Sequence, residues 1–490
     1  MFDYKKILYI TCLFSCIMIA GCKKWIQVDP PVDTITTGDV FTTDKQAEWA
    51  LSGIYSKLVN GQAPGNMIVG AMENFGSGQP AFLGGLSSDE LIPSPSANNG
   101  VIAFLATNSL NERNSAVSDK LWLTAYKSVY DINAILEGLA ASDAPLLTAP
   151  ARSKFRGEAL ALRAFAYFYL VNFYGDVPLV LTTDVYQAAR MRRTPVAEVN
   201  AQIIRDLQES ITLLDADFSA GAGERVRVNK CFAQALLARV SLYMEDFPAA
   251  VAHASSLIGN TALFGLEQDL NRVFRKGSRE TILELMQTNQ DPELKNATAI
   301  GMLMNAGAAG QLPQYYLTEG TASLFDPADK RKQHWISDLG NQLFGMHKYK
   351  TGNHNAVFMA PQEEYLVVMR LAELYLIRAE AIARMQGGVL QDAIRDINVL
   401  RKRADAPELD ENLPQAEVLA LIREERQLEL FGEWGHRWLD LKRTGMAEAV
   451  LSELRWKQPW QGEHQLLYPI PATEIAKNNN LVQNPKHNVQ

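Results

Sequence analysis

The sequence is poor in cysteine and histidine, with Cys 4 and His 7 among 490 residues. Cys12, Cys16 and Cys22 fall at the N-terminal end, and only Cys231 lies in the body of the chain. A single internal cysteine excludes a disulfide framework and a cysteine metal site, and its apolar helical surroundings predict a small buried side chain. The histidines form no His-Glu-x-x-His motif, so we predict no metal site.

Motifs that carry catalysis are also missing. The chain has no Gly-x-Ser-x-Gly nucleophile turn, and the glycine-rich piece Gly76-Ser77-Gly78 lacks the lysine of a phosphate loop. Glu424 and Glu425 would point roughly 100° apart on a helix, so they cannot flank a glycosidic bond as a catalytic pair. Together with Arg426 and Glu429 they are spaced for an ion-pair network that holds helices together. The sequence therefore predicts a protein that is not an enzyme and has no cofactor.

The chain also lacks an excess of positive charge and any long apolar run after Cys22. Its formal net charge is -8, and without the first 21 residues, which carry Lys5, Lys6 and Asp3, it is -9. Binding to duplex nucleic acid needs clustered Lys and Arg, so no nucleic acid is expected as a partner. The body of the chain is therefore expected to be a globular part outside the bilayer.

The N-terminal end has the parts of an export signal. Lys5 and Lys6 precede an apolar run from Ile7 to Ala20, and the run ends in Ile19-Ala20-Gly21-Cys22, a lipobox. We expect residues 1–21 to be a lipoprotein signal peptide and Cys22 to carry the lipid, with fatty acyl chains such as palmitate tethering the chain to a membrane. The alternative is an uncleaved transmembrane anchor, but the run is shorter than the roughly 20 residues that such a helix needs.

Apolar residues recur at helical spacing over most of the chain that follows. Residues 22–45 contain Pro30 and Pro31 and little periodicity, which predicts an extended lipidated tether. Residues 46–490 are predicted to form a single domain. Its helical scaffold should comprise about 46–60, 119–258 and 362–445, because three- and four-residue steps mark one apolar helix face there.

Two helical hairpins, at 229–258 and 371–403, combine alanines with large apolar and aromatic residues in the rhythm of a tetratricopeptide repeat. Small residues let paired helices approach closely, and each hairpin leaves an apolar face that a further hairpin must cover. The predicted fold class is therefore mainly α, a tetratricopeptide-like alpha-alpha superhelix with irregular loop-rich insertions. An unrelated helix bundle is the alternative.

The predicted insertions are residues 61–118 and 259–361, and a closing segment follows at 446–490. Irregular stretches of this length are commonly functional. Sugar rings stack their CH faces on aromatic rings and pair their hydroxyls with Asn, Asp and backbone groups, and both insertions are rich in these residue types. The candidate ligand-binding residues are Asn74, Phe75, Phe82, Asp89, Asn98 and Asn99 in the first insertion, and Tyr315, Tyr316, Trp335 and Asn341 in the second.

Four separate motifs resemble those of the SusD/RagB family of outer-membrane nutrient-binding lipoproteins. Their order and spacing span nearly the whole chain after Cys22. One departure is Lys486-His487, where many relatives have Gly-Tyr, and it concerns the packing of the last turn. The four are Arg156-Gly157-Glu158-Ala159 through Tyr174-Gly175-Asp176-Val177-Pro178; Arg370-Leu371-Ala372-Glu373-Leu374-Tyr375 through Arg378-Ala379-Glu380-Ala381; Ile422-Arg423-Glu424-Glu425-Arg426 with Gly435-His436-Arg437-Trp438; and Tyr468-Pro469-Ile470-Pro471 with Gln483-Asn484-Pro485.

The resemblance implies a helical scaffold whose insertions hold the ligand, and a SusC-like TonB-dependent outer-membrane transporter as partner. The leading interpretation is a non-catalytic lipoprotein, anchored in the outer membrane and facing the cell surface, that binds an oligosaccharide and delivers it to this transporter. A peptide ligand, a tetratricopeptide-like interaction scaffold and a hydrolase are the alternatives. The leading interpretation requires the two insertions to lie together around a shared hollow that holds the ligand.

Overall fold

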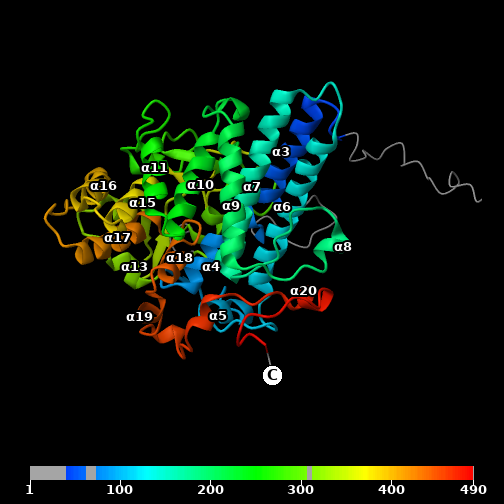
Figure 1. The fold of residues 1–490 in the computed structure, drawn as a ribbon. Helices are drawn as coiled ribbons and strands as arrows, with labels where there is room; N and C mark the ends of the chain where they lie inside the picture. Colours follow the sequence, from blue (N-terminus) through cyan, green and yellow to red (C-terminus); the bar gives the residue numbers. More distant parts are fainter. Residues whose placement is uncertain (1–39, 62–72, 306–311, 489–490) are drawn as a thin grey trace, which may run out of the picture.

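The computed structural model describes residues 40–61, 73–305 and 312–488. The predicted signal peptide, Cys22 and most of the predicted tether lie outside these ranges. Long antiparallel helices stand side by side in a curved row that runs from α3 and α6 to α16 and α17 (Figure 1). They are α3 (Asp44–Asn60), α6 (Ala116–Ala141), α7 (Ala149–Tyr174), α9 (Val196–Leu213), α10 (Lys230–Tyr243), α11 (Phe247–Ile258), α15 (Leu371–Arg384), α16 (Leu390–Arg403), α17 (Gln415–Leu430) and α18 (His436–Arg443).

Local sequence sets the ends of these helices. Thr148 begins α7 by accepting a hydrogen bond from the Ala151 amide, and Pro150 fits the first turn, where no amide donor is needed. Gly175 ends the helix with a φ of 74°, a conformation that favours glycine. On α10 and α11, Ala238 and Ala254 are fully buried, so the two helices pack closely. The predicted mainly α superhelix is confirmed.

The two predicted insertions are joined by a small antiparallel sheet. Its strand order is β1-β3-β5-β4, and Ile92 of β1 lies opposite Tyr316 of β3. The first insertion contributes β1 and the second contributes the other three strands, so the two insertions lie together. The hollow of the candidate site, however, is lined by the scaffold and the second insertion and by no described residue of the first insertion, so the predicted shared hollow is not the one found there. The strands are β1 (Leu91–Pro93), β3 (Tyr315–Leu317), β4 (Ile336–Asp338) and β5 (Phe344–Met346); a second, two-stranded sheet pairs β2 (Thr281–Leu285) with β6 (Leu366–Arg370).

Short helices connect the long helices and the strands. The C-terminal segment packs beneath them, where Tyr468 Oη lies 2.8 Å from Ser87 Oγ and a ring nitrogen of His487 lies 2.8 Å from the Leu110 carbonyl oxygen. His487 is therefore buried against the first insertion. The short helices are α4 (Gln79–Ser87), α5 (Gly100–Ala106), α8 (Val185–Ala188), α12 (Ala299–Met304), α13 (Glu319–Ser323), α14 (Lys330–Trp335), α19 (Ala447–Leu451) and α20 (Ala472–Lys477).

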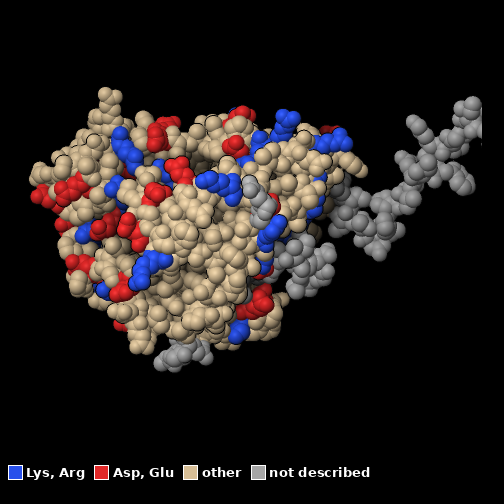
Figure 2. All heavy atoms as spheres, turned by 90° about the horizontal axis from the view of Figure 1, so that it is seen from below, with Lys and Arg blue, Asp and Glu red and all other residues tan. Residues whose placement is uncertain are grey.

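The end of the molecule at which α5, α19 and α20 lie carries few charged residues over its centre. Figure 2 shows this face, with lysine, arginine and carboxylate side chains spread around its edge rather than gathered in one large patch of a single sign. On this face there is no broad cationic surface of the kind that a nucleic-acid backbone requires.

A buried ionic cluster connects the helical scaffold to the second insertion. Glu429 on α17 accepts hydrogen bonds from Arg331 at 2.9 Å, Arg370 at 2.6 Å and Arg403 at 2.5 Å. All four side chains are at most 1% exposed. The predicted ion-pair network is present, but its partners come from α14, β6 and α16 rather than from neighbouring turns of α17.

Candidate ligand-binding site

A hollow of about 500 Å³ lies where α3, the loop 220–227, the segment after β2 and residue 362 meet. Its volume falls in the range of small-molecule sites, roughly 300–1,000 Å³. The scaffold supplies one wall through α3, and the second insertion supplies the opposite wall through residues 286–289. The lining residues are Ser52, Tyr55, Ser56, Asn60, Ala220, Gly221, Val226, Arg227, Met286, Gln287, Thr288, Asn289 and Gln362.

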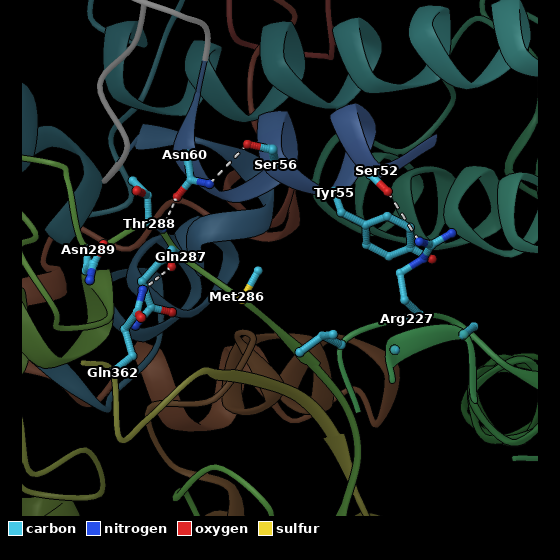
Figure 3. A pocket seen from close by; sticks show the side chains of 13 residues that line it. Ser52, Tyr55, Ser56, Asn60, Arg227, Met286, Gln287, Thr288, Asn289 and Gln362 are labelled. Atoms are coloured by element: carbon cyan, nitrogen blue, oxygen red, sulfur yellow. Dashed lines mark hydrogen bonds between the residues drawn. The ribbon is translucent and has the colours of Figure 1, made fainter. Parts of the chain in front are cut away.

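We call this hollow the neutral hollow, because its one charged lining residue, Arg227, is paired with the buried Glu158. Its lining residues form two groups at opposite ends. Figure 3 shows the side-chain amides of Asn60, Gln287, Asn289 and Gln362 on one side, with Thr288, and Ser52, Tyr55 and Arg227 on the other. Met286, whose side chain is 50% exposed, lies between them. The hollow therefore combines many uncharged hydrogen-bonding groups with one flexible apolar contact.

Gln287 carries a polar atom that the fold leaves unused. Its Nε2 donates to the Glu364 carbonyl at 2.9 Å, whereas its Oε1 is buried without a hydrogen-bond partner. A buried acceptor left unpaired costs roughly 1–3 kcal/mol, so such atoms commonly mark a place where a ligand or water completes the bonding. Gln287 is thus a strong candidate for a ligand contact.

Tyr55 and Arg227, by contrast, are fixed by a buried carboxylate. Arg227 donates to both oxygens of Glu158, at 2.8 and 3.1 Å, and Tyr55 Oη donates to Glu158 Oε2 at 2.7 Å. Burial raises the pKa of Glu158, and Arg227 opposes this shift. Glu158 does not line the hollow, and neither does any other carboxylate of the described chain. The hollow therefore lacks the carboxylate pair that glycoside hydrolysis requires.

The structure places several of the ten candidate residues in the core. Phe75 packs against Phe165 and Trp434, with ring centroids 5.1 and 6.3 Å away, and Trp335 is fully buried and donates to the Leu270 carbonyl. Neither ring presents a face to solvent in this conformation. Both rings are buried because apolar neighbours surround them. The sequence alone did not distinguish aromatic rings that fill the core from rings that stack on a sugar.

Four other candidates are brought together by the sheet. The rings of Phe82 and Tyr315 lie 4.7 Å apart, Tyr316 is the next residue on β3, and Asp89 holds Arg437 through two bonds of 2.7 Å. Phe82, Tyr315 and Tyr316 are at most 9% exposed. They join the insertions to each other, and Asp89 joins the first insertion to α18.

The remaining four candidates are asparagines. Asn74 is buried, and its carbonyl accepts from the Ser77 amide and hydroxyl. Asn98, Asn99 and Asn341 are exposed, with Asn99 preceding α5. None of the ten candidate residues lines the neutral hollow.

Sequence reasoning missed the residues that do line the hollow, because isolated amides and hydroxyls carry no spacing signal. It also gave no special role to the turn Val357–Met359, whose three side chains are 51–61% exposed. Asn289, a lining residue, accepts from the Met359 amide at 2.9 Å and donates to the Ala360 carbonyl. The exposed Phe358 is therefore held on a turn that is hydrogen-bonded to a lining residue of the hollow.

Among the described residues, no group of three or more His, Cys, Asp or Glu side chains is arranged to hold a metal ion. In that same part of the chain, no helix is long and apolar enough to cross a membrane.

Two family models match most of the chain. A model described as "SusD family" matches residues 258–487, and one described as "Starch-binding associating with outer membrane" matches residues 66–242. The chain belongs to the SusD/RagB family. Membership of this SusD/RagB family supports a nutrient-binding rather than a catalytic role, and association with the outer membrane.

Individual relatives match this chain over nearly its full length. SusD-like protein P2 of Formosa agariphila is 26% identical over 98% of both chains. The crystal structure of a SusD superfamily protein from Bacteroides vulgatus superposes with a TM-score of 0.77 at 19% identity, covering 91% of this chain and 99% of that one. A laminarin-binding SusD-like protein superposes with a TM-score of 0.75 at 22% identity, over 91% and 100% of the two chains. These structures confirm the SusD superfamily fold.

Proposed function

We propose that the protein is a non-catalytic, lipid-anchored surface protein that binds an oligosaccharide and passes it to a SusC-like TonB-dependent outer-membrane transporter. The observation that carries the proposal is the neutral hollow, which is lined by hydroxyls and side-chain amides and by Gln287, whose side-chain oxygen has no hydrogen-bond partner. Sugar hydroxyls donate and accept hydrogen bonds without charge, so this lining matches them. Relatives described as starch-binding and laminarin-binding support the same ligand class.

Different lining residues of the hollow would contact different parts of a sugar ring. Gln287 Oε1 would accept from a sugar hydroxyl, and the hydroxyls of Ser52 and Ser56 on α3 would contact the opposite edge of the ring. Met286 offers an apolar contact for CH groups, and Phe358, on the turn bonded to Asn289, offers an exposed aromatic ring. The absence of a carboxylate from the described lining supports release of the ligand unchanged.

Ligand class is tested by calorimetry with maltoheptaose and laminarihexaose, preceded by a glycan array, and by a parallel peptide array. We expect binding to one or more oligosaccharides and no release of reducing sugar. Binding to peptides with no binding to any glycan would show that the ligand is a peptide rather than an oligosaccharide. Hydrolysis of a bound glycan by the purified protein would contradict the non-catalytic role.

The transporter is tested by affinity purification of the tagged full-length lipoprotein from detergent-solubilised outer membranes. We expect a large TonB-dependent barrel to co-purify. Recovery of the lipoprotein alone, from membranes in which such a barrel is detected, would contradict delivery to that transporter.

The lipid anchor gives a separate prediction. Cys22→Ser removes the only thiol that the lipobox positions for acylation, so the protein should lose metabolic labelling by palmitate and leave the membrane fraction. The control is Cys231→Ser, at a buried position remote from the N-terminus, which should keep the label. Persistent labelling of the Cys22→Ser variant would show that the anchor is elsewhere.

A further inference from the structure

A second hollow, of about 630 Å³, adjoins the neutral one and differs from it in charge. Three of the four segments that line the neutral hollow, all but α3, continue into it. Val226 gives way to Arg225, Met286 to Glu284, and Gln362 to Glu363. The remaining charged lining residues are Glu224, Arg275 and Lys276. A chain-like ligand that leaves the neutral hollow at this side would therefore enter a charged one.

Glu284 is the unusual member of this charged hollow. It lies on β2 and is 1% exposed, and its backbone amide donates to the Arg225 carbonyl at 2.9 Å. Its side-chain Oε2 is buried without a hydrogen-bond partner. An ionised carboxylate with an unpaired buried oxygen is costly, and such groups take up a proton instead. A neutral Glu284 can donate a hydrogen bond to an anionic group of a ligand.

The cations of the charged hollow are held loosely. Arg275 pairs with Glu363, and Lys276 pairs with Glu224 at 2.6 Å; all four side chains are 37–66% exposed. Exposed pairs of this kind contribute little, roughly 0–1 kcal/mol, so a ligand can exchange one partner for another. Arg225 is fixed differently, because its guanidinium donates to the carbonyls of Thr281 and Leu263 and has no carboxylate hydrogen-bond partner.

With Glu284 neutral, three cations face two carboxylates, which leaves one positive charge unbalanced in a protein that is negative overall. We propose that the charged hollow binds the carboxylate of a uronic acid residue in an oligosaccharide whose neutral residues occupy the first hollow. The ligand carboxylate would pair with Arg275 and Lys276 and accept a hydrogen bond from Glu284. This inference rests on the proposed function, since it names the class of sugar that the same protein takes.

The test is a glycan array that carries the same oligosaccharide backbones with and without uronic acid, followed by calorimetry at pH 7 on the strongest pair. We expect the uronate-bearing member to bind about tenfold more tightly, the size of one charge-assisted hydrogen bond. Arg275→Gln and Lys276→Gln should each remove most of this preference. The matched control is Arg395→Gln, an arginine 57% exposed on α16, which should keep the preference.

Varying the pH tests the contribution of Glu284 to ligand binding apart from that of the cations. Burial raises the pKa of Glu284 to about 8, so its carboxyl is neutral at pH 7 and ionised at pH 9, where it would repel the ligand carboxylate. Hydrogen bonding to Glu224 raises the pKa of Lys276, and burial holds that of the nearby Tyr349 well above its usual range, so neither changes charge over this interval. Burial lowers the pKa of Lys350, which interacts with Arg275, to about 8, so Lys350 loses its charge over the same interval in the wild type and in Glu284→Gln alike. The uronate preference should therefore fall more between pH 7 and pH 9 in the wild type than in Glu284→Gln.

The outcomes separate this inference from the function on which it rests. Binding confined to neutral glycans, or a uronate preference that neither Arg275→Gln nor Lys276→Gln changes, would overturn the inference and leave oligosaccharide binding intact. A preference that stays constant from pH 7 to pH 9 in the wild type would contradict the role of Glu284. No binding to any glycan would overturn both.

Discussion

Replacing Glu429 by glutamine is expected to lower the free energy of unfolding by about 3–5 kcal/mol, because the change leaves buried cations without their counter-charge. Glu429 accepts from Arg331, Arg370 and Arg403, and all three guanidinium groups are at most 1% exposed. Glutamine keeps the size of the side chain but can neither balance this charge nor accept from all three donors. The measurement is chemical denaturation of the purified protein, followed by circular dichroism.

The matched control is Glu411→Gln, which removes a carboxylate 49% exposed and 3.7 Å from Arg395. That pair is expected to contribute less than about 1 kcal/mol. A Glu429→Gln variant that is destabilised no more than the control would show that the ionic cluster does not hold the scaffold to the second insertion.

The same cluster makes stability dependent on acid. Burial acts to raise the pKa of Glu429, but Arg403, Arg370 and Arg331 outweigh it and hold that pKa well below its usual range. A carboxyl with a lowered pKa in the folded state stabilises the protein above its unfolded pKa of about 4.3, and the stabilisation is lost as the pH falls through the folded pKa. Below about pH 4, stability should thus fall more steeply in the wild type than in Glu429→Gln.

Ser56→Trp is expected to weaken oligosaccharide binding about 100-fold or more, equal to about 2.7 kcal/mol. Ser56 is exposed on α3 and lines the neutral hollow, so an indole there would occupy the space that a sugar ring needs (Figure 3). Several ligand hydrogen bonds, each worth roughly 0.5–1.5 kcal/mol, would be lost together. The helix itself should tolerate the change because the position faces solvent. Calorimetry against the tightest glycan from the array gives the result.

Lys57→Trp provides the control for this variant. Lys57 is the next residue of α3, does not line the hollow, and pairs with Asp131 of α6 at 3.1 Å. The same ring placed there should leave affinity within about twofold and cost only an exposed ion pair. Equal loss of binding in both variants would mean that α3 is disturbed as a whole, and unchanged binding in Ser56→Trp would exclude the neutral hollow as the site.

The scaffold was predictable from sequence because its signals are local and repeated. Alanines such as Ala238 and Ala254 recur at helical spacing in the predicted hairpin 229–258, and both are fully buried. The predicted function required the two insertions to lie together. The sequence did not predict that they would do so by pairing β1 with β3. Strands of three residues carry too little alternation to be recognised.

The binding residues were harder to predict, for a physical reason. Aromatic rings in an insertion have two uses, and Phe75 and Trp335 turned out to fill the core rather than face a ligand. Gln287 and Gln362 are separated by 75 residues and meet only because β2 and β6 pair in one sheet. No spacing rule connects them, and what distinguishes Gln287 is an unpaired buried oxygen, a property of the folded chain.

Calorimetry of the wild type and Ser56→Trp with an array-selected oligosaccharide tests the account most directly. Binding by the wild type, its loss in Ser56→Trp and its retention in Lys57→Trp are the predicted results. A glycan that binds both Ser56→Trp and the wild type with the same affinity would contradict the claim that the neutral hollow between α3 and the second insertion holds the ligand.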